Sequence, residues 1–161
     1  KRMVGRDGPQ PLAEFERVIA INLVGTFNMM RLVAAGAQNL EPLDGGERGV
    51  IVSTASVAAY EGQIGQTAYA ASKAGLIHLA KSMALEWGRY NINVNAICPG
   101  YILTEINQAH FESDAGQKLI ARLPRRRVGK PEDLDAVLLM LASGRSGFVN
   151  GAVISADDGP T

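Results

Sequence analysis

Apolar positions in the first quarter of the chain recur at steps of three and four residues. From residue 12 to about residue 40 this spacing is kept by Phe15, Val18, Ile19, Leu23, Phe27, Met30, Val33 and Ala37. It places the apolar side chains on one face of a helix. Asn22 and Gly25 lie inside the pattern and are poor helix residues, so they predict a local break or a polar role there. Residues 1–11 are polar and rich in glycine and proline, which predicts a loop.

Strands and helices alternate along the rest of the chain. Residues 49–55 form an apolar run that predicts a buried strand, and residues 92–97 alternate apolar and polar side chains as a strand does. Between them, residues 67–88 carry an apolar stripe that predicts a helix. A helix is expected at 134–142, after a proline and two acidic residues, and a short last strand at 152–155.

Strands separated by helices favour parallel pairing with right-handed crossovers. We therefore expect an α/β fold with a doubly wound parallel sheet of the Rossmann type. Residues 1–161 would form a single, partial domain. Residues 101–128 are polar and only weakly helical, which indicates an insertion that contributes to substrate binding.

Charge and composition narrow the classes of function. The formal net charge is zero, with 16 basic and 16 acidic residues, which argues against nucleic acid or an anionic membrane as partner. Cys98 is the only cysteine, and the two histidines lie far apart, so neither a disulfide framework nor a metal site is expected. No apolar stretch reaches the roughly 18 residues of a membrane span, and the start lacks the apolar region of a signal peptide. We expect a cytoplasmic protein with a small-molecule substrate.

Tyr69 and Lys73 are the strongest candidates for chemistry. Four residues apart on one helix, they share a face. An ammonium stabilises a phenolate more than a phenol, so such a tyrosine is suited to exchange protons. Ser56 follows the strand at 49–55, where α/β sheets place ligand contacts. Alternatives remain open, because Tyr-x-x-x-Lys also occurs by chance, Ser56 could only cap the strand end, and Asn22 could only break its helix.

These residues, in this order, resemble the short-chain dehydrogenase/reductase family. Asn22, Ser56, Tyr69 and Lys73 match its active-site residues, and the segment from Pro99 and Gly100 to Thr104 matches its Pro-Gly…Thr segment beside the nicotinamide. The stretches 129–134 and 149–151 match its C-terminal signatures, so the resemblance spans nearly the whole chain. Residues 21–75 are most similar to hydroxyacyl-CoA and hydroxysteroid dehydrogenases, and residues 86–159 to bacterial ketoacyl reductases.

The resemblance implies an oxidoreductase that transfers a hydride between NAD or NADP and a secondary alcohol or ketone, with a 3-hydroxyacyl or 3-ketoacyl thioester expected as substrate. The implied catalytic residues are Asn22, Ser56, Tyr69 and Lys73. The implied cofactor-binding residues are Tyr69, Lys73, Pro99, Gly100, Ile102 and Thr104. Substrate binding is expected from Ser56, Gln63, Tyr69 and Tyr101, with Tyr60, Ile64, Gln66 and Phe111 as further pocket candidates. Family members are usually dimers or tetramers built from the long helices, here 12–40 and 67–88, and from the last helix and strand, so a homodimer or homotetramer is expected.

One departure from the family pattern limits these expectations. No Gly-x-x-x-Gly-x-Gly or Gly-x-Gly-x-x-Gly segment occurs in residues 1–161. Such a loop presents backbone N–H groups to the cofactor phosphates at a helix N-terminus. The chain therefore resembles the C-terminal portion of a family member, and the choice between NAD and NADP is left open. The alternative function is that of a non-catalytic fragment, able only to pack or oligomerise.

Overall fold

A parallel sheet of three strands lies at the centre of the protein, in a computed structural model that describes residues 2–6 and 8–161. Strand β3 (Gly49–Thr54) pairs with β4 (Ile92–Pro99), which pairs with β5 (Val153–Ala156). Gly49 lies opposite Ile92, and Ala96 opposite Val153. The parallel pairing expected from the alternation of strands and helices is confirmed.

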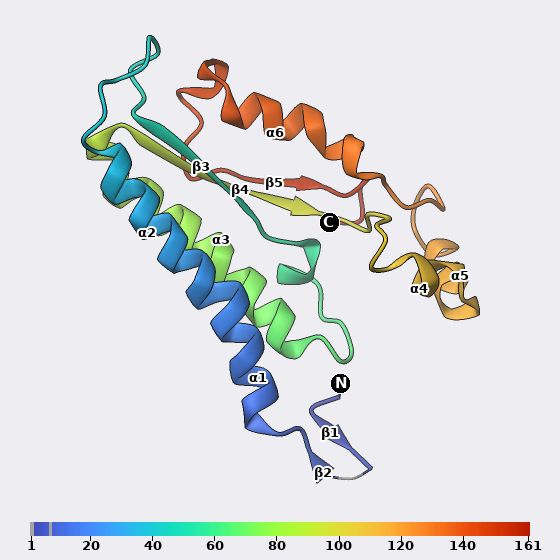
Figure 1. Ribbon diagram of the computed structural model, residues 1–161. Helices are drawn as coiled ribbons and strands as arrows, with labels where there is room; N and C mark the ends of the chain where they lie inside the picture. The colour runs from blue at the N-terminus through green and yellow to red at the C-terminus, as the bar shows by residue number, and fades with distance from the viewer. Residues whose placement is uncertain (1, 7) are drawn as a thin grey trace.

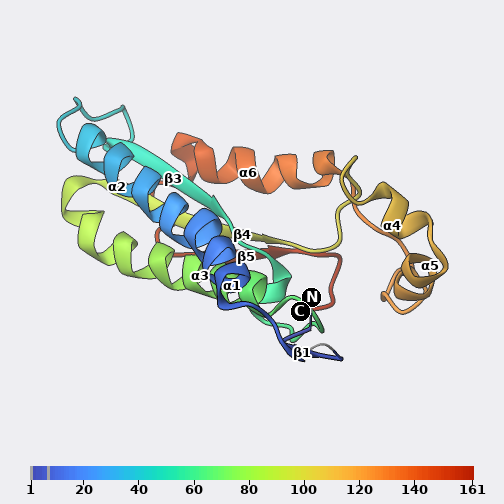
Figure 2. The same ribbon diagram turned by 60° about the horizontal axis from the view of Figure 1, so that its bottom comes forward.

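Helices cover both faces of this sheet, as a doubly wound fold requires. Helices α1 (Leu12–Ile19), α2 (Gly25–Ala37) and α3 (Thr67–Trp87) lie on one face, and α6 (Asp135–Ala142) lies on the other (Figures 1 and 2). The short helices α4 (Gln108–Glu112) and α5 (Asp114–Ile120) stand to one side, beyond the C-terminal end of β4. Both lie within residues 101–128, where only weak helical character was expected.

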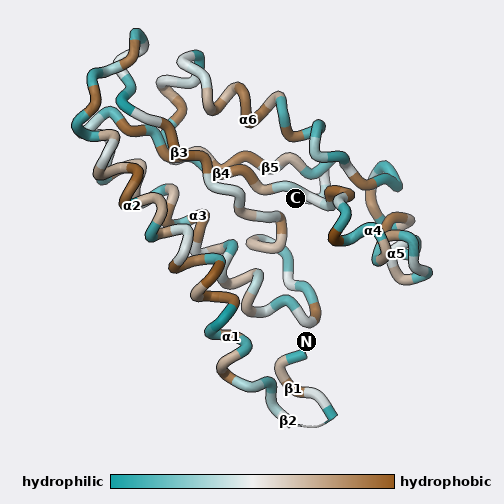
Figure 3. The backbone as a smooth tube through the Cα atoms, in the orientation of Figure 1, coloured by the Kyte–Doolittle hydropathy of each residue, from teal (hydrophilic) through white to brown (hydrophobic). Residues whose placement is uncertain are grey.

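The core lies between the sheet and the helices α2 and α3. Hydrophobic residues concentrate in the strands and in the helices beside them (Figure 3). Small side chains let the helices approach closely, and the main cluster consists of Met30, Ala34, Ala37, Ala80, Met83, Ala84, Ile92, Val94 and Ala96. A second cluster, Ala55, Leu76, Ile77 and Cys98, underlies the C-terminal ends of β3 and β4. It therefore supports the end of the sheet where Ser56 and Pro99 emerge.

The helical pattern at residues 12–40 contains a wide turn rather than a break. Residues Ala20–Val24 form a π-helical segment, η1, and the chain continues directly into α2. The hydroxyl of Thr26 donates to the carbonyl oxygen of Asn22 at 2.7 Å. A β-carbon on Gly75 would lie 2.9 Å from Cδ1 of Leu23, so a larger residue at this position would require the Leu23 side chain to move. Single π-helical turns are frequent at functional sites.

Two expectations need correction. Residues 1–11 were expected to form a loop, but β1 (Val4–Gly5) and β2 (Gly8–Pro9) pair antiparallel. Glycine and proline, which suggest a loop, are also compatible with so short a ladder.

The expectation that no apolar stretch reaches the length of a membrane span was also wrong. The continuous helix Leu12–Ala37 is long and apolar enough to cross a membrane, since its most apolar window of 18 residues has a mean hydropathy of 1.6. Length and composition alone do not distinguish such a helix from one that packs against protein.

Three asparagines hold the chain before β5 against β4. Asn95 is fully buried, donates to the carbonyl of Val149 at 2.8 Å and accepts from the backbone N–H of Ala152 at 2.9 Å. Asn93 donates to the carbonyl of Gly147, while Asn150 accepts from Val94 and donates to Ala84. Short 3₁₀ turns complete the chain at Val57–Ala59, Gly88–Tyr90, Pro131–Leu134 and Gly144–Ser146.

Candidate active site

A cavity of about 330 Å³ opens at the C-terminal ends of β3 and β4. In open α/β sheets this end of the strands is where ligands bind. Most of the candidate residues from the sequence line it, namely Ser56, Gln63, Gln66, Tyr69, Lys73, Pro99, Gly100, Tyr101, Ile102 and Phe111. The fold thus brings together segments that are up to 55 residues apart, from Ser56 to Phe111.

Ser56 has both roles that the sequence left open as alternatives. It caps the short turn Val57–Ala59, and its Oγ accepts from the backbone N–H of Ala58 at 3.2 Å. A serine hydroxyl also has one proton to donate. Because Ser56 lines the cavity, that proton is available to an oxygen atom bound there.

Tyr69 and Lys73 share one face of the first turns of α3. The Nζ atom of Lys73 lies 5.6 Å from the centre of the Tyr69 ring and donates to the carbonyl of Thr54 at 2.8 Å. Burial lowers the pKa of Lys73, and the neighbouring Cys98 acts in the opposite direction. The Tyr69 hydroxyl has no hydrogen-bond partner within residues 2–6 and 8–161, so it is free to meet a ligand.

Asn22 lies outside the cavity wall but is tied to the same helix. Its Nδ2 donates to Oγ of Ser72 at 3.2 Å, and Ser72 donates to the carbonyl of Tyr69 at 2.7 Å. Ser72 is fully buried. Asn22 and Tyr69 also line a second, open hollow beside α1. The π-helical turn therefore connects to Tyr69 through one buried hydroxyl.

Of the remaining candidate residues from the sequence, some line the cavity and others are exposed outside it. Gln63 donates to the hydroxyl of Tyr101 at 3.0 Å across the cavity. Burial raises the pKa of Tyr101, Glu61 adds to this shift, and Gln63 opposes it. Thr104 is exposed and outside the cavity wall, and so are Tyr60 and Ile64.

Two residues beside the site were not singled out from the sequence. Ser72 resembles any small helical residue until the structure shows its two hydrogen bonds. Asn107 lines the cavity and binds both the carbonyl of Ile102 and the N–H of Thr104, each at 2.8 Å. Its position directly before α4 is typical of a helix cap, and this signal could have drawn attention to it.

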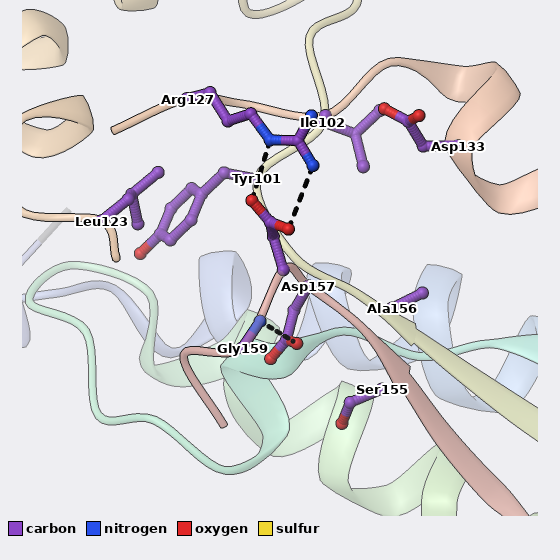
Figure 4. Close-up of a pocket in the computed structure, with 11 residues that line it drawn as sticks. Tyr101, Ile102, Leu123, Arg127, Asp133, Ser155, Ala156, Asp157 and Gly159 are labelled. Atoms are coloured by element: carbon purple, nitrogen blue, oxygen red, sulfur yellow. Dashed lines mark hydrogen bonds and ion pairs between the residues drawn. The ribbon is translucent and has the colours of Figure 1, made fainter. Parts of the chain in front are cut away.

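A second cavity, of about 430 Å³, adjoins the first through Tyr101 and Ile102. The guanidinium of Arg127 forms two hydrogen bonds with Asp158 at its rim, at 2.9 and 3.0 Å (Figure 4). Asp157 accepts from the N–H groups of Gly159 and Thr161. The C-terminal tail is thereby held against the insertion.

The ion pair between Arg127 and Asp158 makes the free energy of unfolding depend on pH in the acidic range. Hydrogen bonding to Arg127 lowers the pKa of Asp158 below its ordinary value of 3.8. The carboxylate of Asp158 therefore binds a proton more readily in the unfolded chain than in the folded chain. The ion pair's contribution to stability is present above the ordinary pKa of Asp158, and it is lost as the pH falls through the pKa of Asp158 in the folded chain. In urea titrations between about pH 5 and pH 2, the free energy of unfolding should fall less steeply for Asp158→Asn than for the wild type. Equal slopes would contradict this. Since the pair is exposed, salt should reduce the difference.

Comparison with known proteins places the chain among characterised relatives. A family model described as "Enoyl-(Acyl carrier protein) reductase" matches residues 6–161. The chain is 38% identical over 146 residues to acetoacetyl-CoA reductase of Shinella zoogloeoides. It is 40% identical over 147 residues to 3-hydroxyacyl-CoA dehydrogenase type-2 of Rattus norvegicus. Each match covers 91% of this chain but only 58% and 55% of the relative, so the chain spans little more than half their length.

Solved structures give the same result. The crystal structure of 3-hydroxyacyl-CoA dehydrogenase type-2 from Mycobacterium avium matches with a TM-score of 0.89 and 42% identity, over 99% of this chain and 61% of that one. A 7α-hydroxysteroid dehydrogenase in complex with NADH matches with a TM-score of 0.82 and 34% identity, over 93% and 57%. A gluconate 5-dehydrogenase from Burkholderia cenocepacia in complex with NADP matches at 0.85 and 31%, over 99% and 60%.

The family model covers nearly all of the chain, and both the order of the site residues and the parallel sheet agree with the resemblance seen in the sequence. The chain belongs to the short-chain dehydrogenase/reductase family.

Proposed function

We propose that this chain supplies the proton-transfer part of an NAD(P)-dependent oxidoreductase that interconverts a secondary alcohol and a ketone. The observation that carries the proposal is the convergence of Ser56, Tyr69 and Lys73 on one cavity at the C-terminal ends of the strands. A hydroxyl, a phenol and an ammonium meet there, and each can donate a proton to a hydrogen bond.

The chemistry of reduction follows from these donors. A carbonyl accepts a hydride only when the negative charge that develops on its oxygen is stabilised. Ser56 and Tyr69 donate hydrogen bonds to that oxygen, and Tyr69 then transfers its proton to it. In the direction of oxidation, Tyr69 takes the proton from the alcohol. The ammonium of Lys73 stabilises negative charge on the phenol oxygen in both directions.

The residues present fit a nicotinamide cofactor at this site. A bound nicotinamide supplies or accepts the hydride. Lys73 uses one N–H on Thr54, which leaves two for ribose hydroxyls. Pro99, Gly100 and Ile102 line the cavity and would contact the nicotinamide, whereas Thr104 is exposed and lies outside the cavity wall. Asn22, through Ser72, positions the turn that carries Tyr69.

We propose a 3-hydroxyacyl or 3-ketoacyl thioester as the substrate. Support comes from the relatives named acetoacetyl-CoA reductase and 3-hydroxyacyl-CoA dehydrogenase. Gln63 and Tyr101, joined by a hydrogen bond, would form the polar wall that meets the acyl chain's thioester end. Other relatives act on steroids or gluconate by their names, so the substrate class needs direct measurement.

A chimera can test this substrate class. The segment that precedes the matched region in the rat 3-hydroxyacyl-CoA dehydrogenase type-2 would be joined in front of this chain. We expect kcat/KM for acetoacetyl-CoA to exceed that for a 7-keto steroid or a keto-gluconate by at least tenfold. A preference for either of the latter would overturn the thioester assignment and leave the oxidoreductase assignment intact.

A second candidate function is that of a fragment that packs or oligomerises without catalysis. The absence of a glycine-rich phosphate loop from residues 1–161 favours it for the isolated chain. Exposed apolar side chains along η1 and α2, namely Ile21, Val24, Phe27, Met29, Leu32 and Val33, support association into a homodimer or homotetramer. We further propose a cytoplasmic location, in line with the single buried cysteine.

A further inference from the structure

Two arginines converge on one carboxylate at the rim of the second cavity, the one of about 430 Å³ that adjoins the candidate active site. The guanidinium of Arg127 donates to both oxygens of Asp158, at 2.9 and 3.0 Å (Figure 4). Nη1 of Arg125 lies 3.2 Å from Oδ1 of the same carboxylate. Neither guanidinium has another acidic partner within residues 2–6 and 8–161. Two positive charges therefore face a single negative one.

These ion pairs are suited to exchange. The side chains of Arg125 and Arg127 are 68% and 58% exposed, so water screens their attraction to Asp158. A guanidinium has five N–H donors, and Arg127 uses two of them on Asp158. The backbone of Asp158 has a φ of 64°, in the left-handed region that favours glycine. An anion that takes over the arginines would therefore also allow this backbone to relax.

The other acidic side chains of the second cavity do not occupy the arginines. Asp157 accepts from two backbone N–H groups of the C-terminal tail, and Asp133 accepts from the N–H of Lys130 at 2.7 Å. Among the described residues, neither carboxylate forms an ion pair. Their charges repel an anion from the interior of the cavity. Any anion site is therefore confined to the rim, on the exposed side of the two arginines.

The second cavity also lies next to the expected position of the thioester. Tyr101 and Ile102 belong to the walls of both cavities. In the proposed substrate complex the thioester meets Tyr101, and the carrier group is attached to the sulfur of that thioester. Leu123 and Ala156 give the second cavity apolar surface, and Ser155 adds a hydroxyl (Figure 4). This mixture suits a carrier arm of methylene and amide groups that leads from Tyr101 to the rim.

We propose that Arg125 and Arg127 form an anion clamp for the phosphate groups of a coenzyme A thioester, and that Asp158 occupies this clamp until the substrate displaces it. The proposal rests on the thioester substrate proposed above. Guanidinium groups bind phosphate through paired, charge-assisted hydrogen bonds, and a phosphate has more acceptor oxygens than a carboxylate. Residues 125–127 are the only three consecutive basic residues in the sequence, which has a net charge of zero.

Titration calorimetry of coenzyme A into the 161-residue chain, at low ionic strength, tests the clamp. The isolated chain is used because a glycine-rich phosphate loop, which residues 1–161 lack, would itself bind phosphates in the chimera. Pantetheine is the second probe, since it has a similar arm but no phosphate. We expect saturable binding of coenzyme A and at least tenfold weaker binding of pantetheine.

Charge-matched variants separate the clamp from general attraction to basic residues. Asp158→Asn removes the competing charge and should tighten the binding of coenzyme A at least threefold. Arg125→Gln and Arg127→Gln should each weaken it at least threefold. Arg126→Gln and Asp114→Asn are the controls, because both residues are exposed and belong to no ion pair within the described part of the chain. They change the net charge by the same amounts, and each should leave binding within twofold of the wild type.

Several results would overturn the clamp. They are equal binding of coenzyme A and pantetheine, binding by Asp158→Asn that is absent or no tighter than that of the wild type, and a loss in Arg126→Gln as large as that in Arg127→Gln. Because the titration measures binding without reduction, its result does not depend on catalysis. If the clamp binds coenzyme A as expected but the chimera reduces no ketone, the proposed function fails and the clamp stands.

Discussion

Replacing Tyr69 with phenylalanine is expected to lower the rate of ketone reduction by about 10²–10⁴-fold, the usual contribution of general acid catalysis. The substitution removes one oxygen atom from the wall of the cavity formed by residues 54–111 and leaves the ring in place. In the proposed mechanism Ser56 would still donate a hydrogen bond to the carbonyl oxygen, but Tyr69 would no longer supply the proton. The loss should fall on kcat more than on KM, because the missing interaction is strongest in the transition state.

The measurement is the steady-state reduction of acetoacetyl-CoA by the chimera described above, with and without Tyr69→Phe. Tyr90→Phe is the control, since Tyr90 lies before β4, at the opposite end of the sheet from the cavity, and also bears a phenol. It should retain the wild-type rate. If Tyr69→Phe reduces the ketone as fast as the Tyr90 variant does, Tyr69 is not the proton donor.

The largest expected effect on folding comes from Asn95→Ala. Asn95 is fully buried and satisfies the carbonyl of Val149 and the N–H of Ala152. Alanine leaves both backbone groups without a partner in the interior. Each unsatisfied group costs about 1–3 kcal/mol, so the free energy of unfolding should fall by about 2–6 kcal/mol. This is a large share of the 5–15 kcal/mol or so that stabilises an ordinary domain.

Urea denaturation of the 161-residue chain, followed by far-UV circular dichroism, gives this difference directly. Asn28→Ala is the matched control, because Asn28 is exposed and its side chain accepts a hydrogen bond from Arg31 on the same helix. Its effect should stay within about 0.5 kcal/mol. A wild-type midpoint for Asn95→Ala would show that the segment before β5 does not depend on this side chain.

The fold was readable from the sequence where one physical pattern dominated. The apolar run at 49–55 and the alternation at 92–97 predicted strands, and the intervening helix predicted their parallel pairing. Tyr69 and Lys73 were identifiable because a helix places residues four apart on one face. Ser56 joined them because the strand before it ends at the same edge of the sheet.

Other features depend on contacts that no local pattern encodes. The π-helical turn at Asn22 arises where α3 passes close to Leu23, a contact between residues 52 positions apart. Ser72 links Asn22 to Tyr69 only because two helices pack side by side. The antiparallel pair Val4–Gly5 and Gly8–Pro9 contains the glycine and proline that suggested a loop. Glu47 looked like any loop acid until the segment at 144–150 covered it.

The central claim is that residues 1–161 hold the proton-transfer part of the site but not the part that binds the cofactor phosphates. Titration of NADH and NADPH against the isolated chain and the chimera, followed by nicotinamide fluorescence, tests it most directly. We expect the chimera to bind at least one of the two cofactors at micromolar concentration, and the isolated chain to bind neither at that concentration. Micromolar binding by the isolated chain would contradict the claim, and so would a chimera that binds neither cofactor.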